Sequence, residues 1–105
     1  MAVKGWQRAQ DPALLVLTSL AAGPKHGYAL IGDIEEITGV ALGPGTLYGV
    51  LARLEDAGLV EALPSEDRRR PYKITGAGSA ALRERLLATL AVTSIGLRRL
   101  GVTPA

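Results

Sequence analysis

Four basic side chains lie within six residues of one another, at Arg68, Arg69, Arg70 and Lys73, and no acidic residue separates them. Guanidinium and ammonium groups in such a run are suited to binding phosphates, including those of a nucleic-acid backbone. The alternative is a solvated surface loop. The formal net charge of the chain is only +2, so overall charge does not by itself indicate a nucleic-acid partner.

A second polar group lies on a predicted helix that begins near Pro44 and ends before Gly58. Proline suits the first turn of a helix, and glycine suits the left-handed residue after its end. Apolar residues at i, i+3, i+4 and i+7 predict one buried stripe, formed by Leu47, Val50, Leu51 and Leu54. The opposite face carries Thr46, Gly49, Arg53 and Asp56. A short helix with small and polar residues outward, followed by a basic hairpin, fits the major groove of DNA.

The polar side chains of these regions have alternative roles. Thr46 lies near the helix start, where it can meet a phosphate or a base edge, or cap its own helix. Arg53 can bind a phosphate or a guanine, or pair with Glu55 or Asp56. Lys25 precedes an earlier predicted helix, whose N-terminus is a favourable place for a phosphate. We expect all three, together with the basic run, to contact DNA.

The elements that position these residues follow from apolar periodicity and from glycine and proline. Helices are predicted over 12–22 and 27–38, before the helix that begins at Pro44. Leu30, Ile34 and Ile37 are expected to bury one face of the second helix, and Tyr28 to pack between the first two helices. Strands are predicted over 59–63 and 72–74, joined by a charged turn. A long helix is predicted over 76–100.

Three helices, a hairpin and a final helix predict a mainly α fold with a β-hairpin wing, a winged helix-turn-helix. The long final helix carries more leucine than so small a domain can cover. Pairing with a second subunit by two-fold symmetry is therefore expected, with dimerisation contacts from Leu82, Leu86, Leu87, Leu90 and Leu97. We divide the chain into a DNA-binding region over 1–75 and a dimerisation region over 76–105.

Several function classes are excluded by residues that the chain lacks. It has no cysteine and one histidine, His26, so neither a metal site nor a cofactor is expected. No plausible catalytic set is present, and Gly43-Pro44-Gly45 does not follow a predicted strand as a phosphate loop would. No apolar run reaches the roughly 18 residues of a membrane span, and the polar start does not resemble a signal peptide. A cytoplasmic location is expected.

The single tryptophan, Trp6, lies before the first predicted helix. One interpretation is an anchor that pins the N-terminal segment on the long helix of a partner subunit. The other is a ligand-binding residue that lines a cavity or stacks on a flat effector. With so few aromatic residues elsewhere, support for the ligand-binding interpretation is weak.

The chain resembles the PadR family of bacterial transcriptional regulators. The matching segments keep their order and spacing, and they are 17–20 followed by 23–28, then 44–48, 53–60, and 69–75 with 77–78. The likeness is to the short subgroup with one C-terminal dimerisation helix. It implies a homodimer that binds a pseudo-palindromic operator and represses transcription. In this family a small-molecule effector often relieves the repression. The likeness also implies a phosphate contact through the hydroxyl of Tyr48, whose alternative role is a half-buried ring packed on the second helix.

Three positions depart from the family pattern. Gly49 stands where relatives have a larger residue, which removes a base contact from the predicted recognition helix and leaves the operator sequence open. Pro71 stands where many relatives have a tyrosine or a lysine, and Gly76 stands where an acidic residue is common. These two departures bear mainly on the stiffness of the wing and on the start of the long helix. The small net charge keeps an alternative function, a winged-helix module whose basic wing docks an acidic protein partner.

Overall fold

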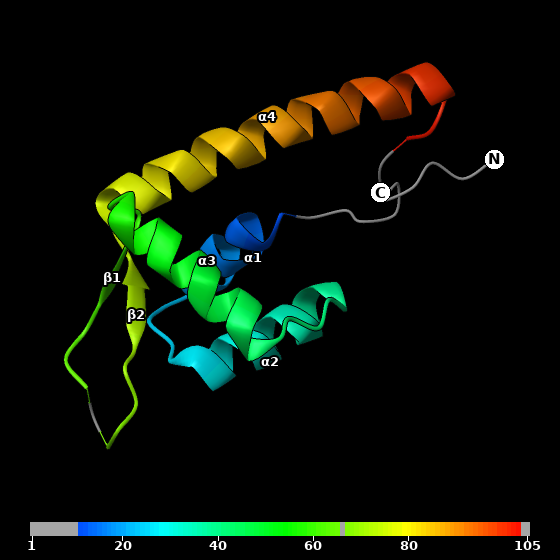
Figure 1. The fold of residues 1–105 in the computed structure, drawn as a ribbon. Helices are drawn as coiled ribbons and strands as arrows, with labels where there is room; N and C mark the ends of the chain where they lie inside the picture. The colour runs from blue at the N-terminus through cyan, green and yellow to red at the C-terminus, as the bar shows by residue number, and fades with distance from the viewer. Residues whose placement is uncertain (1–10, 66, 104–105) are drawn as a thin grey trace.

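The computed structural model describes residues 11–65 and 67–103. Three helices are followed by a hairpin and a long helix that extends away from the rest of the fold (Figure 1). The elements in chain order are α1 (Pro12–Leu20), α2 (Gly27–Thr38), α3 (Pro44–Asp56), β1 (Val60–Ala62), β2 (Tyr72–Ile74) and α4 (Gly76–Leu100). This order is the winged helix-turn-helix expected from the sequence, so the fold class is confirmed.

The hydrophobic core lies where α1, α2 and α3 meet. Its largest fully buried side chains come from all three helices and from β1, and they are Leu20, Leu30, Ile34, Leu47, Leu51, Val16, Val50 and Val60. The stripe predicted for α3 is confirmed, since all four of its residues are buried. α1 is covered on more than one side, as expected of a helix that is apolar nearly all round.

α1 begins as predicted and ends two residues early. The Asp11 carboxylate accepts a hydrogen bond from the Ala13 amide at 2.9 Å, which satisfies one N–H of the first turn. The helix was expected to reach Ala22, but Leu20 is its last residue. The backbone turns at Ala21 and Gly23, and this turn brings Lys25 beside β2. The predicted C-terminal bound of α1 is therefore wrong, because the residues after Leu20 form the connection that pairs with β2.

α2 has the predicted bounds, but two of its side chains lie elsewhere than expected. Tyr28 is 78% exposed, because Leu30 and Ile34 occupy the side of the helix that faces the core. The prediction that Tyr28 packs between α1 and α2 is therefore wrong. Ile37 is also exposed, since it lies in the last turn, beyond the part of α2 that the core covers.

α3 ends in a Schellman motif that sets the direction of the wing. Gly58 has φ of 76°, its amide donates to Glu55, and the Leu59 amide donates to Leu54 at 2.9 Å. Leu59 therefore belongs to the helix end, and β1 is Val60–Ala62 rather than the predicted 59–63. β1 pairs antiparallel with β2, with Glu61 opposite Lys73.

α4 begins where the hairpin closes. The Thr75 hydroxyl donates to the Gly58 carbonyl at 2.7 Å and accepts from the Gly78 amide at 3.0 Å. Gly78 is buried, and a Cβ at this position would collide with the Leu59 carbonyl oxygen. The absence of a side chain thus allows α4 to pack directly on the backbone of Leu59, between α3 and β1. From there 25 residues of helix span about 37 Å.

Candidate nucleic-acid interface

The outward face of α3 is polar, small and accessible. Thr46, Gly49 and Arg53 are all exposed. The sequence left an ion pair as the alternative role of Arg53, but its guanidinium pairs with neither Glu55 nor Asp56 in the part of the chain that the structure describes. A Cβ at Gly49 would meet nothing within 4 Å, so the space beside the helix backbone is open at this position. The face could therefore approach a groove closely.

Tyr48 joins this face to the start of α2. Its side chain is half exposed, and its hydroxyl packs so closely on Gly27 that a Cβ there would collide with it. The packing on α2 that the sequence offered as one role of Tyr48 is thus present, and the phosphate contact stays a prediction. Gly27 is thus required by close approach, and Tyr48 holds the N-terminal half of α3 against the first turn of α2.

The wing continues the same surface. His26, which precedes Gly27, lies 3.5 Å from a guanidinium nitrogen of Arg69, measured from its Nε2. A cavity of about 400 Å³ lies beside them, lined by His26, Asp67, Arg69 and Pro71. Contacts therefore run without a break from α3 through the start of α2 to the wing.

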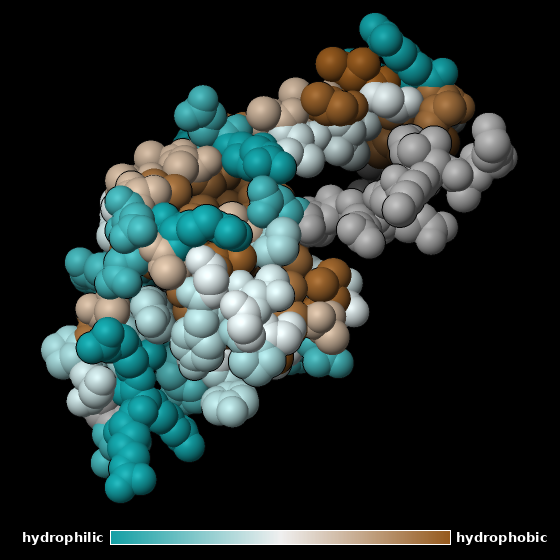
Figure 2. Space-filling model, in the orientation of Figure 1, coloured by the Kyte–Doolittle hydropathy of each residue, from teal (hydrophilic) through white to brown (hydrophobic). Residues whose placement is uncertain are grey.

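The basic residues of the wing differ in how they are held. Asp67 and Arg68 have φ of 49° and 67°, a left-handed pair within the turn that joins the two strands. Arg68, Arg69 and Arg70 are exposed, whereas Lys73 forms an ion pair with Glu61 at 3.1 Å across the strands. Figure 2 shows the wing as strongly hydrophilic and the surface over α3 as mildly polar, on one face of the molecule.

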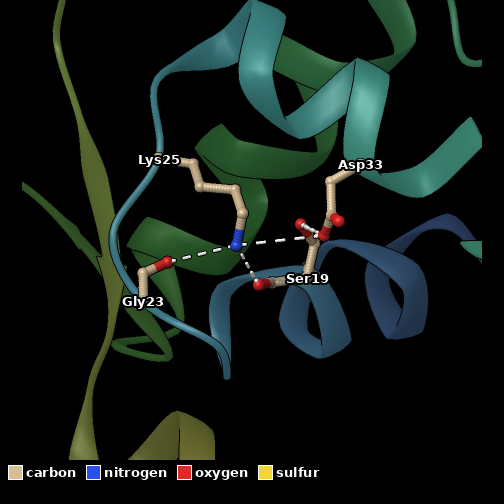
Figure 3. Close-up of polar contacts among 4 residues, drawn as sticks. All are labelled: Ser19, Gly23, Lys25 and Asp33. Carbon is tan, nitrogen blue, oxygen red and sulfur yellow. Dashed lines mark hydrogen bonds and ion pairs between the residues drawn. The ribbon is translucent and has the colours of Figure 1, made fainter. Parts of the chain in front are cut away.

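Lys25 does not extend outward with the other predicted contacts. Its ammonium donates to the Ser19 carbonyl at 2.5 Å and to the Gly23 carbonyl at 3.4 Å, and it lies 3.8 Å from the Asp33 carboxylate (Figure 3). We therefore leave Lys25 out of the DNA surface. This cluster was not predicted from the sequence, although one signal was available: a serine on a mainly apolar helix needs a partner when it is buried.

The exposed surface of α4 is of a different kind. Leu86, Leu87 and Leu90 are exposed, and Leu97 is partly so. Brown, apolar surface is visible on the far half of this helix in Figure 2. Leu82 was expected in the subunit interface, but it is only 6% exposed and belongs to the core of its own chain. A cavity of about 340 Å³ opens between α1 and α4, lined by Ala21, Ser79, Leu82, Arg83, Leu86 and Leu87.

Trp6 lies outside the described residues. Over residues 11–65 and 67–103, histidine and acidic side chains form no group of three that could hold a metal ion. No helix in these ranges is long and apolar enough to cross a membrane.

The chain is similar to a family of known proteins. Residues 16–84 match the model of the transcriptional regulator PadR-like family. This chain belongs to that family. A PadR family transcriptional regulator from Eggerthella lenta has the same fold, with a TM-score of 0.69 and 32% identity, over 88% of this chain and 82% of that one. The regulators of this family are DNA-binding proteins and not enzymes.

Two curated relatives of the PadR-like chain each match about two thirds of it or slightly more. An uncharacterized 37.1 kDa protein in transposon TN4556 of Streptomyces fradiae is 51% identical over 75 residues, 71% of this chain and 22% of that protein. The transcriptional activator GvpE2 of Halobacterium salinarum is 36% identical over 70 residues, 67% of this chain and 35% of that protein. The matched part of the chain thus spans about a third or less of the length of these relatives.

Proposed function

We propose that the PadR-like chain acts as a homodimer that binds a pseudo-palindromic operator near a promoter and represses transcription. The observation that carries this proposal is the continuous surface formed by α3, the first turn of α2 and the wing. Each dimer would carry two such surfaces, and a two-fold operator would offer two half-sites about 34 Å apart or a multiple of this distance.

The two parts of this surface would perform different tasks. α3 would enter the major groove, where Thr46 and Arg53 reach base edges or phosphates. The exposed arginines of the wing would neutralise backbone phosphates and supply the salt-sensitive part of the affinity. Lys73 would join them only by leaving or sharing its ion pair with Glu61, so we expect it to contribute less. The hydroxyl of Tyr48, already packed on Gly27, would reach a phosphate from the same edge.

The apolar face of α4 supports the homodimer. Leu86, Leu87 and Leu90 are exposed and lie within about one turn of each other, beyond the buried start of α4. A second copy offers an identical apolar face, and two-fold pairing would cover both at once. In this proposal residues 1–75 supply DNA binding and residues 76–105 supply dimerisation. A regulator that binds chromosomal DNA in this way would work in the cytoplasm.

Repression is the direction we assign, because a dimer seated on promoter DNA blocks polymerase without any further contact. Relief by a small-molecule effector belongs to the same proposal. The cavity between α1 and α4 lies at the joint between the winged region and the long helix. A ligand at this joint would change the angle of α4 and hence the spacing of the two DNA-binding surfaces, which gives the coupling that allostery requires.

The first test is binding of the purified chain to fragments of its own upstream DNA across a salt series, with unlabelled competitor present. We expect one fragment to be preferred, with an affinity that falls steeply with salt. Equal and weak binding to every fragment would contradict sequence-specific recognition of this region. A reporter driven by the preferred fragment then gives the direction, since expression that rises with the regulator would make it an activator.

A further inference from the structure

α1 and α2 meet at the ammonium group of Lys25. It donates to a carbonyl at the C-terminal end of α1, at Ser19, and it pairs with Asp33 on α2 (Figure 3). A cation at this end of a helix is favourable, because the last carbonyls carry the negative end of the helix dipole. The Lys25 and Asp33 side chains are only 19% and 29% exposed, so water screens their pairing less than it would at the surface.

Ser19 completes the cluster. It is 2% exposed, and its hydroxyl donates to the same Asp33 carboxylate oxygen that faces Lys25. Every buried side-chain nitrogen or oxygen in the described residues has a partner. Asp33 therefore holds Ser19 of α1 and Lys25 of the following connection together, and removal of its charge would weaken both interactions.

The backbone of Lys25 is bound to the wing. Its amide donates to the Tyr72 carbonyl at 3.1 Å, and the Tyr72 amide donates back to its carbonyl at 2.9 Å. This pair makes Lys25 a one-residue third strand beside β2, the strand that follows the wing arginines. The side chain of Lys25 is thus fixed to α1 and α2, while its main chain is fixed to the hairpin.

We propose that Lys25, held by Ser19 and Asp33, is a positioning residue that sets the wing relative to α3. The inference rests on the proposed function, in which the wing contacts DNA. In the bound dimer this cluster orients the wing so that its arginines reach the backbone while α3 occupies the groove. It makes no contact with DNA itself.

The decisive variant is Asp33→Asn, because two roles of Lys25 predict opposite effects. If Lys25 contacted a phosphate, removal of the opposing carboxylate would release its ammonium and tighten binding. If Lys25 positions the wing, Asp33→Asn weakens binding about tenfold, the size expected when one charge-assisted hydrogen bond is removed, although the protein becomes more positive. The salt slope should flatten by about 0.9 for each phosphate that the wing no longer neutralises. A purely structural defect would lower the melting temperature and leave that slope unchanged.

Glu36→Gln is the matched control. Glu36 lies one turn after Asp33 on α2, is exposed, and takes part in no ion pair among the described residues. The variant removes the same charge without touching the cluster, so its affinity for DNA should stay equal or rise slightly. If Glu36→Gln weakens binding as much as Asp33→Asn does, the effect comes from α2 in general and the proposal is wrong.

A double variant tests whether the pair acts as a unit. Lys25→Met should weaken binding about as much as Asp33→Asn, and Lys25→Met with Asp33→Asn should be no weaker than either alone. Additive losses of affinity would overturn the pairing. Lys25→Arg, which keeps the charge, should recover most of the affinity. If Asp33→Asn fails to fold, Ser19→Ala keeps both charges and should weaken binding in the same direction by roughly threefold.

Removal of both Arg69 and Arg70 separates the positioning role from the wing contact on which it rests. If the double arginine variant binds weakly and Asp33→Asn binds as tightly as the natural chain, the wing contacts DNA and the positioning role is wrong. If the arginine variant binds normally, the proposed wing contact itself is wrong and the inference falls with it.

Discussion

α3 and α4 both carry a leucine-rich stripe, but among the residues that the structure describes only the stripe of α3 is covered along its whole length. Leu47, Val50, Leu51 and Leu54 are all buried against α1, α2 and β1. On α4 only Gly78 and Leu82 are buried, and Leu87 and Leu90 remain 54% and 59% exposed. One stripe completes a core, while the other is an apolar face that residues 11–65 and 67–103 leave largely uncovered.

The exposed faces of the same two helices differ in the opposite sense. The open side of α3 carries the hydroxyl of Thr46, the guanidinium of Arg53 and, at Gly49, no side chain at all. These groups are compatible with a hydrated, anionic groove. The open side of α4 carries leucine, for which water is a poor solvent. The chemistry of the uncovered face thus separates the helix expected to meet DNA from the helix expected to meet protein.

The strongest test of this comparison places charge on α4. Leu87→Glu combined with Leu90→Glu should convert the dimer to a monomer. Four half-exposed leucines per dimer would lose burial of roughly 3–6 kcal/mol in total, which weakens association by at least about a hundredfold. Sedimentation velocity at micromolar concentration measures the change directly. Operator affinity should fall in parallel, because a monomer reaches only one half-site.

The control for this pair is the helix content of the variant. Its winged region should remain folded, since neither leucine belongs to the core. A variant that stays dimeric with both glutamates in place would show that α4 is not the subunit interface and would remove the basis of the comparison.

Truncation of a leucine on α3 should act on folding instead. Leu47 is fully buried, so Leu47→Ala should lower the free energy of unfolding by about 2–5 kcal/mol through reduced burial and the cavity it leaves. Chemical denaturation at fixed protein concentration measures it, because dimerisation would otherwise change the apparent stability. Tyr28→Ala, at an exposed site on α2, should change stability by less than about 0.5 kcal/mol. An equally large destabilisation at Tyr28 would mean that this surface is covered in solution.

Within the surface proposed to face DNA, substitutions in the wing and in α3 should change DNA binding in different ways. Arg69→Ala with Arg70→Ala should weaken binding to all sequences about equally, by roughly tenfold, and reduce the salt slope of the dimer by about three to four units. Thr46→Ala should instead reduce the preference for operator over unrelated DNA and leave the salt slope nearly unchanged. Titrations of both variants against operator and unrelated fragments decide this. A sequence-dependent weakening in the wing variant would assign base contacts to the wing.

The arrangement of elements could be predicted because local signals agreed with the fold. Asp11, Pro44, Gly58 and Thr75 mark helix ends by their own chemistry, and apolar spacing identifies the buried side of α3. The errors lie where packing between distant residues decides the outcome. α1 ends early so that Lys25 can reach Tyr72, a pairing between residues 47 positions apart that no local pattern contains.

The functional surface was predictable only in part, for the same reason. Residue type and position on the helix suggested Thr46 and Arg53, and both are exposed as expected. Lys25 has the same charge as the wing residues, so its sequence neighbourhood could not distinguish an internal ammonium from an outward one. Only the placement of Ser19 and Asp33 around it does so.

The smallest expected effect concerns Gly49, in the middle of the exposed face of α3. A glycine inside a helix costs stability relative to alanine, because the unfolded chain has more freedom to lose. Nothing lies within 4 Å of a Cβ placed there, so Gly49→Ala should raise the free energy of unfolding by about 0.5–1 kcal/mol without strain. Chemical denaturation of the two proteins measures this gain. A stabilised variant that binds its operator less well would show that α3 approaches the groove at Gly49 itself. Unchanged binding would instead place the contact surface toward Thr46 and Arg53. A decrease in stability would contradict the open space that the structure shows beside this residue.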